Sequence, residues 1–499
     1  MRNDTLFELI KKMTPTEKRY FLRYYKGRSQ NENDYIRLFH VLNQMKAYNK
    51  ETLLKKVDGF NFKAHIEEKK HHLLHLIAQT LSGYYFSNKT STHSLSEVDV
   101  FIKKEMYSYA NKCLVALLIQ VRESEDFIFE AQILEKQILL CPYLEELKAD
   151  QLFNEQRTCF EKSKNLLDYN YLFYDLITVV NKYSFVRHSA QLMQYERFKN
   201  HRLLTNPSEV LSLKASFFKY IFSYLYHASI GEFNKSYDAA LKAHILFENH
   251  VQTTGNFASL YLQSMSARFS SMLLTHYNSV EFSKIKSELI TNSKKISDPK
   301  LNKVSRAMIY QYELISYVKE AKYDSALELV KEAVLFIEDN PILAVSNAIK
   351  YLSFDIAKTY FIVGDYSTAN LWFLKTNFAE NKTKSTDIFA FSRILSLICD
   401  IFLDQTDLTK YNASYLRKQL RKLGVLHSYE SFLINYISTK LINWHQLTTD
   451  KKIALLEKFK KEITLQLDNE WKSNTILYFD FETWSDRKIN ELKNLKPIK

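Results

Sequence analysis

The stretch IAKTYFIVGDYSTANLWF, residues 356–373, contains the pattern that decides the fold of this chain. Gly364 and Asp365 interrupt a run of apolar and helix-forming residues, Tyr366 follows, and the small residue Ala369 comes three positions later. Glycine directly after an apolar helical run is a frequent helix end, because it adopts a positive φ without a steric penalty. The stretch therefore predicts a pair of helices joined by a tight turn.

The same arrangement recurs along the C-terminal part of the chain. An aromatic residue followed after three positions by a small or β-branched one occurs, with spacings of 44, 46 and 43 residues, at Phe233, Tyr277, Tyr323 and Tyr366. Another 42 residues lead to Leu408, and Tyr107 lies about three such periods before the first of the four. A period of about 20–50 residues is typical of helical repeats. Each period has room for two helices and two turns.

Residues 356–373 resemble a tetratricopeptide repeat. In that family a first helix carries a large residue, a small residue and a tyrosine, and the second helix turns a small and an aromatic residue inward. The matching positions here, including the turn glycine and the aromatic after it, are Ile356, Ala357, Tyr360, Gly364, Tyr366, Ala369 and Phe373. Weaker copies contain Tyr317, Tyr323, Ala326, Val330 and Ala333, and Gly231, Phe233, Ser236, Ala240 and Ala243.

The recurrence departs from the family in its length, because the period of 43 to 46 residues exceeds the usual repeat of about 34. We therefore expect longer helices and degenerate copies. The resemblance implies a right-handed α-solenoid that binds proteins or peptides along its concave face.

The composition predicts an all-α fold. The 499 residues include only 7 Gly and 6 Pro, far below the usual shares of about 7% and about 5%. Strands joined by tight turns need both residues. No two glycines lie closer than the 24 positions between Gly59 and Gly83, which excludes the glycine-rich loops that hold phosphates in common nucleotide-binding folds.

Cysteine usage and hydropathy indicate a protein of a reducing compartment. The four cysteines form no CxxC pair and are far apart, at Cys113, Cys141, Cys159 and Cys399, so neither a disulfide framework nor a thiolate zinc site is predicted. Residues 1–12 carry acidic and basic side chains before any apolar run develops, so we expect no secretory signal. The longest apolar stretch, residues 113–119, is far shorter than the roughly 20 residues of a membrane span. We expect a cytoplasmic protein without membrane contact.

A hydroxyl-rich segment divides the chain. Residues 87–96 contain seven serines, threonines and asparagines, and such residues compete with helical hydrogen bonds. We predict a basic helical N-terminal domain at 1–86, a Ser/Thr-rich linker at 87–96 and a TPR-like α-solenoid at 97–499. Residues 1–90 hold 17 Lys and Arg against 9 Asp and Glu, a net charge of +8 out of the +13 of the whole chain.

One predicted helix of the N-terminal domain carries a basic face. The helix should begin at Thr14, where Thr14-Pro15-Thr16-Glu17 forms a capping box, and end near Gly27. At about 100° per residue, one arc is apolar and the opposite arc is cationic. The apolar arc comprises Tyr20, Phe21, Leu22, Tyr24 and Tyr25; the cationic arc comprises Arg19, Arg23 and Lys26. The cationic arc is a candidate contact surface for phosphates or for a protein partner.

The chain offers no recognisable catalytic constellation. Glu68, His71, His72 and His75 share one side of a predicted helix, but the adjacent lysines would repel a cation and the order does not match a zinc-protease motif. We interpret this group as a solvated polar face and predict no metal and no cofactor. The abundant aromatic residues, 14% of the chain, are interpreted as core packing.

The sequence alone favours two functions, and an enzyme with an unfamiliar site is a third alternative that it leaves open. The first is a non-enzymatic scaffold or adaptor that binds a protein or peptide partner in the concave groove of a helical-repeat array. The second is a nucleic-acid-binding regulator, in which residues 1–90 hold DNA or RNA and the array acts as a sensor. The identity of the partner, the pathway and the oligomeric state do not follow from the sequence.

Overall fold

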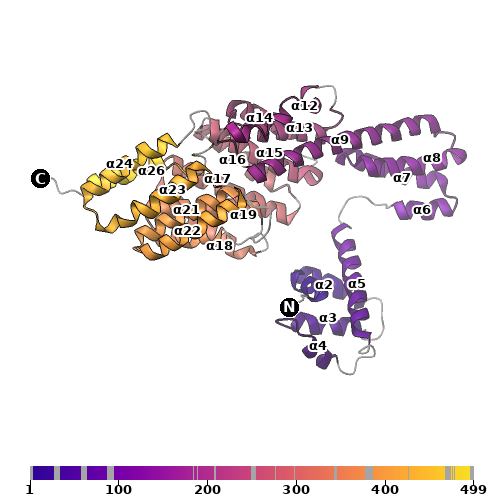
Figure 1. Cartoon of the computed structure of the whole chain (residues 1–499). Coiled ribbons are helices and arrows are strands. Elements are labelled where there is room, and N and C mark those ends of the chain that lie inside the picture. The colour runs from indigo at the N-terminus through magenta and orange to yellow at the C-terminus, as the bar shows by residue number, and fades with distance from the viewer. Residues whose placement is uncertain are drawn as a thin grey trace. The chain divides into compact units, whose positions relative to one another are not determined.

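A computed structural model gives the fold of the chain (Figure 1). It describes residues 4–26, 34–57, 65–86, 95–183, 185–187, 189–206, 210–248, 254–275, 277–296, 298–341, 346–376, 386–424, 426–466, 474, 476 and 478–494. All regular structure in these residues is helical, so the prediction of an all-α fold is confirmed. Within the same ranges, no helix combines the length and apolarity needed to cross a membrane. The chain divides into two compact units, Met1–Leu117 and Leu118–Lys499.

The first unit contains a small helical core. Its helices are α1 (Thr5–Lys12), α2 (Pro15–Lys26), α3 (Asp34–Gln44), α4 (Lys50–Lys56), α5 (Ile66–Phe86), α6 (Leu95–Lys103) and the first part of α7 (Tyr107–Ser124). Phe21, Phe39 and Leu73 are fully buried in its centre. The predicted capping box is present, because the Thr14 amide donates to the Glu17 carboxylate at 2.7 Å and the Glu17 amide donates to the Thr14 hydroxyl at 3.3 Å.

A buried lysine fastens three parts of this unit. The Lys70 ammonium on α5 donates to the Tyr48 hydroxyl at 3.0 Å and the Glu67 carboxylate at 2.8 Å, and it pairs with Asp4 before α1. Burial alone lowers the pKa of Lys70, but its hydrogen bonds to Asp4, Glu67 and Tyr48 raise the pKa above the usual value. Lys70 therefore stays charged.

The predicted linker at 87–96 is described only at its end. Residues 87–94 lie outside the described residues, whereas Leu95 and Ser96 begin α6. The last two residues of the predicted linker are thus helical. The division between the compact units falls farther along the chain, within α7.

The second unit is a succession of helix pairs. It begins with the rest of α7, followed by α8 (Phe127–Leu140), the long α9 (Ala149–Tyr183) and the short helices α10 (Ser189–Leu192), α11 (Glu196–Lys199) and α12 (Arg202–Thr205). The pairs follow as α13 (Leu213–Ser229) with α14 (Phe233–Glu248), α15 (Thr254–Thr275) with α16 (Ser279–Ser293), α17 (Pro299–Lys319) with α18 (Tyr323–Asp339), α19 (Asn347–Val363) with α20 (Tyr366–Lys375), and α21 (Thr386–Phe402) with α22 (Thr406–Leu423). The unit ends with α23 (Ser428–Thr439), α24 (Thr449–Leu465) and α26 (Phe481–Asn494).

The recurring aromatic residues mark where the second helix of a pair begins. Phe233, Tyr323 and Tyr366 are the first residues of α14, α18 and α20, and Tyr277 and Leu408 lie two residues from the starts of α16 and α22. The period predicted from the sequence is therefore the period of the helix pairs.

One turn geometry joins the helices of many pairs. A residue with positive φ precedes the next helix by two positions, and the amide after it donates to the carbonyl five residues back, as in Schellman motifs. The residues in this left-handed conformation are Glu105, Glu125, Gly231, Ala321, Gly364 and Asp404. Only two of them are glycines, so glycine content alone understates how often the turn occurs.

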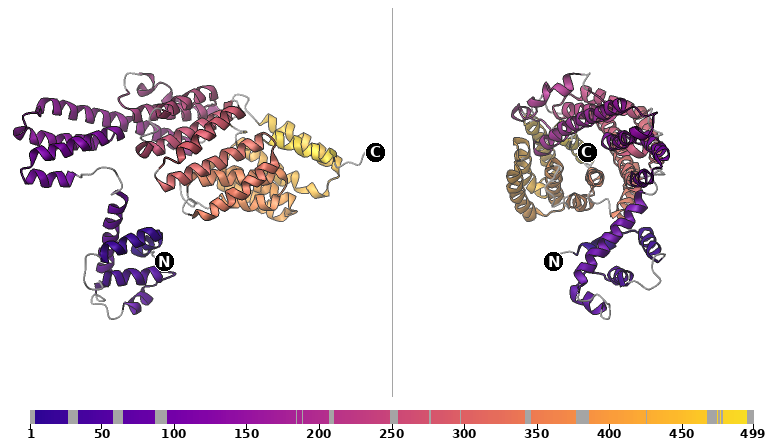
Figure 2. Two further views of the ribbon diagram at one scale, coloured as in Figure 1. Left: turned by 180° about the vertical axis from the view of Figure 1, so that it is seen from behind. Right: turned by 90° about the vertical axis from the view of Figure 1, so that its right-hand side faces the viewer.

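The first helix of each pair contacts the first helix of the next pair. These contacts join α13 to α15, α15 to α17, α17 to α19, α19 to α21 and α21 to α23. Within this unit the pairs follow one another in chain order (Figure 2). Small residues lie where two helices of a pair approach closely, since Ala326, Ala357 and Ala369 are fully buried. The buried hydrophobic residues of these pairs form two clusters, and α17 contributes residues to both.

Candidate functional site

Tyrosine and serine side chains lie on the first helices of four successive pairs, where one is buried, three are half-buried and one is exposed. We call this group the tyrosine face; it comprises Tyr224 on α13, Ser266 and Ser270 on α15, Tyr312 on α17 and Tyr351 on α19. The Tyr312 hydroxyl lies 2.9 Å from the Ser266 hydroxyl and 3.1 Å from the Ser270 hydroxyl. The Tyr312 ring also stacks on Phe269 with centroids 4.6 Å apart.

Burial differs along the tyrosine face. It raises the pKa of Tyr224, next to Tyr312, and it raises the pKa of Tyr312. Both side chains therefore stay neutral and act as hydrogen-bonding groups. Tyr351 is 39% exposed, so at α19 this face opens to solvent. Tyrosine combines a large apolar ring with a polar tip, and it is enriched in protein interfaces.

A buried ion cluster lies at the start of α21 and α23. Arg187, 5% exposed in its side chain, donates from one nitrogen to Asp387 at 3.1 Å and from another to Glu430. The Tyr478 hydroxyl donates to the second oxygen of Asp387 at 3.0 Å. Burial alone lowers the pKa of Arg187, but the charges of Glu430 and Asp387 raise it. The cluster therefore holds one permanent cation between two carboxylates.

Backbone hydrogen bonds extend this cluster to distant parts of the chain. The Val186 amide donates to the Ser229 carbonyl at 2.7 Å, and the Asn474 side-chain amide donates to the carbonyls of Val186 and Ser229 at 2.8 and 3.2 Å. Arg187 and Glu430 are 243 positions apart. These bonds join the segment before α10, the end of α13, the starts of α21 and α23 and the segment before α26. The arrangement is that of a structural clamp.

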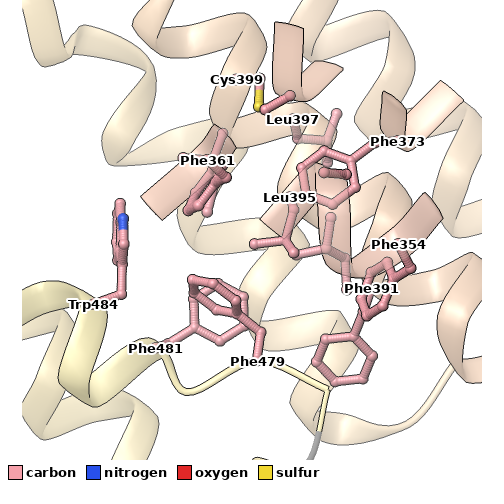
Figure 3. Packing of buried hydrophobic residues seen from close by; sticks show 14 of the residues in the cluster. Phe354, Phe361, Phe373, Phe391, Leu395, Leu397, Cys399, Phe479, Phe481 and Trp484 are labelled. Carbon is pink, nitrogen blue, oxygen red and sulfur yellow. The ribbon is translucent and has the colours of Figure 1, made fainter. Parts of the chain in front are cut away.

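The segment before α26 packs its aromatic side chains on the array (Figure 3). Tyr478 stacks on Phe391 of α21 with centroids 5.2 Å apart, and Phe479 meets Phe361 of α19 at 5.4 Å. Phe481 and Trp484 of α26 are also buried, and the Trp484 ring lies beside Phe361 at 5.9 Å. The array thus holds one of its own segments through aromatic contacts.

Cations on α26 cover the recurring tyrosines. The Arg487 guanidinium lies 4.3 Å from the ring centroid of Tyr323, and the Lys488 ammonium lies 5.4 Å from that of Tyr366. Such cation–π contacts are worth about 0.5–1 kcal/mol at exposed sites and more when desolvated. Helix α26 therefore connects successive pairs at the start of their second helices.

The residues that match the repeat pattern lie at the packed interface and at the turn between α19 and α20. Ala357, Ala369 and Phe373 are fully buried, and Gly364 adopts φ 90° at the turn. Tyr360 is half-buried, and burial raises its pKa, with Asp365 nearby. Tyr366 packs on Phe402 with ring centroids 4.4 Å apart.

The predicted basic face is found on α2. Arg19 and Arg23 are exposed, whereas the side chain of Lys26 lies outside the described residues. The predicted apolar arc needs a correction, because Phe21 is fully buried but Tyr24 is 40% exposed. Tyr24 stacks on the half-buried Tyr20 with centroids 6.5 Å apart. The surface therefore combines two arginines with a tyrosine pair.

The histidine group on α5 forms pairwise contacts. The Nε2 atoms of His71 and His75 lie 3.2 Å apart, the His72 ring packs on Tyr35, and Glu68 lies 3.7 Å from His65. Among the residues described, no group of three or more His, Cys, Asp or Glu side chains is arranged to hold a metal ion.

The cysteines are unpaired thiols. Cys113, Cys159 and Cys399 are buried and Cys141 is half-buried. Burial raises the pKa of Cys113 and Cys399, and burial together with Glu130 raises that of Cys159 to about 11. A raised pKa disfavours the nucleophilic thiolate.

Sequence reasoning missed both the tyrosine face and the Arg187 cluster. The tyrosines of the face are 88, 39 and 127 positions apart in pairs, and no local spacing groups them. The sequence contains only an indirect signal for the tyrosine face: each of its tyrosines lies on the helix that precedes one of the recurring aromatic residues. No protein-family model, curated protein or solved structure matches this chain.

Proposed function

We propose that the protein is a non-enzymatic binding scaffold whose array of helix pairs recognises a polypeptide segment, with the first helices of the pairs lining a concave face of a TPR-like α-solenoid. The observation that carries this proposal is the tyrosine face, to which four successive pairs contribute. Tyrosine and serine together supply contact area and adaptable hydrogen bonds at low entropic cost. Repeat arrays expose such extended surfaces because each pair contacts only its neighbours.

The packing of the C-terminal segment supports a polypeptide as the ligand class. Tyr478, Phe479 and Trp484 occupy positions between the rings of α19, α21 and neighbouring helices. The helix pairs thus bind a segment of their own chain in which aromatic and acidic residues alternate. A partner segment with exposed aromatic side chains would meet the same kind of surface at Tyr351.

The test is quantitative affinity purification from the source cells with the full-length chain as bait. Tyr351→Ala removes the exposed tyrosine of the face, and Tyr411→Ala removes a tyrosine that is 69% exposed on the second helix α22. We expect a polypeptide that is retained by the wild type and by Tyr411→Ala but depleted at least about tenfold by Tyr351→Ala, as for an interface hot spot. Equal retention by all three baits would refute the proposal.

A second function rests on the surface of α2. Arg19 and Arg23 are exposed beside the stacked pair of Tyr20 and Tyr24, and single-stranded nucleic acids bind to basic surfaces with aromatic platforms. We propose nucleic-acid binding through this surface as the alternative. Its affinity should fall steeply with salt.

The alternative is tested on the full-length chain with fluorescent single-stranded DNA and RNA. Replacing Arg19, Arg23 and Lys26 by alanine should flatten the salt dependence. The matched control replaces the exposed Lys410, Lys418 and Lys422 of α22, which changes the net charge equally. The alternative fails if the wild type does not bind at low salt, or if the two triple variants behave alike.

A further inference from the structure

Helix α9 carries an apolar stripe on its solvent-exposed side. The stripe consists of residues that are 51% to 76% exposed: Phe153, Phe160, Leu167, Tyr171 and Tyr174. At 3.6 residues per turn they fall within about 60° of arc. The helix packs on α8 and α13, and its buried residues include Tyr169, Leu172 and Leu176. Contiguous exposed apolar surface of this kind marks interaction sites.

The stripe is large enough for a specific contact. Side chains of this size bury about 150–250 Å² each when fully covered, so the exposed parts of the five offer about 600 Å² on one copy of the chain. Two such surfaces together bury about 1,200 Å², the lower limit for stable protein–protein interfaces.

One flank of the stripe carries charges of alternating sign. These are Arg157, Glu161, Lys164 and Asp168, which fall within about 60° of arc on the same side of the stripe. Arg157, Glu161 and Lys164 are exposed, and Asp168 is half-buried. The order has a centre of symmetry between residues 162 and 163, because Arg157 and Asp168 are equally far from that point, and so are Glu161 and Lys164.

This symmetry matches one way of pairing two helices. When two copies of a helix pack antiparallel about a two-fold axis, the same flank of each helix faces the other copy. An axis at the centre of symmetry brings Arg157 opposite Asp168 of the second copy and Lys164 opposite Glu161 of the second copy. Each pair forms twice. In a parallel arrangement in register, this flank would instead face the opposite flank of the second copy, and these four charges would not meet one another.

The apolar side chains agree with this register. With the axis between residues 162 and 163, Phe160 of one copy lies level with Leu167 of the other to within two residues, about 3 Å along the helix. Phe153 lies level with Tyr171 of the other copy to within one residue. Taken alone, the stripe is symmetric about the point between residues 163 and 164, because Phe153 and Tyr174, and Phe160 and Leu167, are equally far from it. This centre lies one residue from the centre of the charged flank, so the stripe is compatible with the register that the charges specify.

The ends of α9 are complementary as well. Glu145, Glu146 and Asp150 are exposed at its N-terminal end. A hollow between α9, α11 and α12 is lined by Arg197, His201 and Arg202 together with Asp168 and Asp175. The same register brings Asp150 of the second copy level with Asp175, whose carboxylate holds Arg197 at 2.6 Å. The guanidinium of Arg197 then lies between two carboxylates.

We infer that the protein forms a symmetric dimer in which α9 pairs antiparallel with α9 of a second copy, with the two-fold axis between residues 162 and 163. This dimer is distinct from the binding of a partner at the tyrosine face, because the two surfaces share no residue.

The test is the mass of the full-length chain in sedimentation velocity over a wide concentration range. The wild type should change from 59.1 kDa to twice that mass, about 118 kDa, as concentration rises. Arg157→Asp and Asp168→Arg each create two like-charge pairs and should weaken the dimer about tenfold. The double variant Arg157→Asp/Asp168→Arg exchanges both charges and should restore wild-type affinity.

Recovery of dimer affinity in the double variant distinguishes this register from other contacts through the stripe, because only the antiparallel pairing brings positions 157 and 168 together. Phe160→Ser should weaken the dimer through the stripe, and the control Lys410→Asp on α22 should not. Circular dichroism verifies that each variant is folded. A wild type that stays at 59.1 kDa throughout, single variants with wild-type affinity, or a double variant as weak as the singles would overturn the inference.

Discussion

A substitution of Gly364, at the turn between α19 and α20, measures how much the turn geometry contributes to the stability of the helix pair. The φ of 90° at Gly364 lies in the left-handed region, and a Cβ placed there meets no atom within 4 Å. Gly364→Ala therefore introduces no clash. Its cost is the left-handed conformation of an L-residue, about 1–2 kcal/mol, reduced by the smaller entropy of the unfolded chain, about 0.4–1 kcal/mol. We expect a net destabilisation of the helix pair by about 1 kcal/mol.

Local hydrogen exchange is the appropriate assay, because stacked helix pairs can open one at a time. A loss of about 1 kcal/mol corresponds to about fivefold faster exchange in peptides from α19 and α20, while α13 and α14 keep their rates. Gly424→Ala is a matched control, since φ is 73° and the added Cβ again meets nothing within 4 Å, and it should accelerate exchange in α22 instead. Unchanged exchange around Gly364 would refute the turn geometry.

Three further variants probe the clamp, the C-terminal helix and a buried acid. Arg187→Met leaves Asp387 and Glu430 buried without a cation and should destabilise the second unit by about 3–5 kcal/mol, measured by urea unfolding. Trp484→Ala should cost about 3–5 kcal/mol through the lost packing and should expose the C-terminal segment to limited proteolysis. Burial raises the pKa of Asp400, although hydrogen bonds from two asparagine side chains oppose this rise. The protonated carboxyl therefore stabilises the folded state fully below the unfolded-state pKa of about 3.9. This stabilisation is lost as pH rises through the folded-state pKa. The free energy of unfolding of the wild type relative to Asp400→Asn should therefore increase as pH falls from neutral toward that value, and a relative decrease would contradict this sign.

The features that the sequence predicts correctly are local ones. The capping box at Thr14 and the turn glycine Gly364 act within four or five residues of themselves, so their structure follows from backbone chemistry. The period of the helix pairs follows from the aromatic residue after each turn, which packs where two helices meet. Such signals are independent of how the pairs are arranged.

Other turns escaped prediction because their residues do not favour the conformation they adopt. Ala321 and Asp404 have φ 55° and 58° in the same turn that Gly364 makes. The packing of the flanking helices imposes the turn there, so the residue type at that position does not indicate the conformation.

The tyrosine face and the Arg187 clamp depend on contacts between residues far apart in the chain. Arg187 lies 200 positions from Asp387 and 243 from Glu430, so no spacing rule brings them together. A buried ion cluster of this kind adds little net stability, because desolvation offsets the attraction of the charges. Its effect is specificity: an arrangement of the pairs that separates α21 and α23 from Arg187 would leave charges buried and unpaired. The clamp therefore disfavours any stacking of the helix pairs that separates α21 and α23 from Arg187.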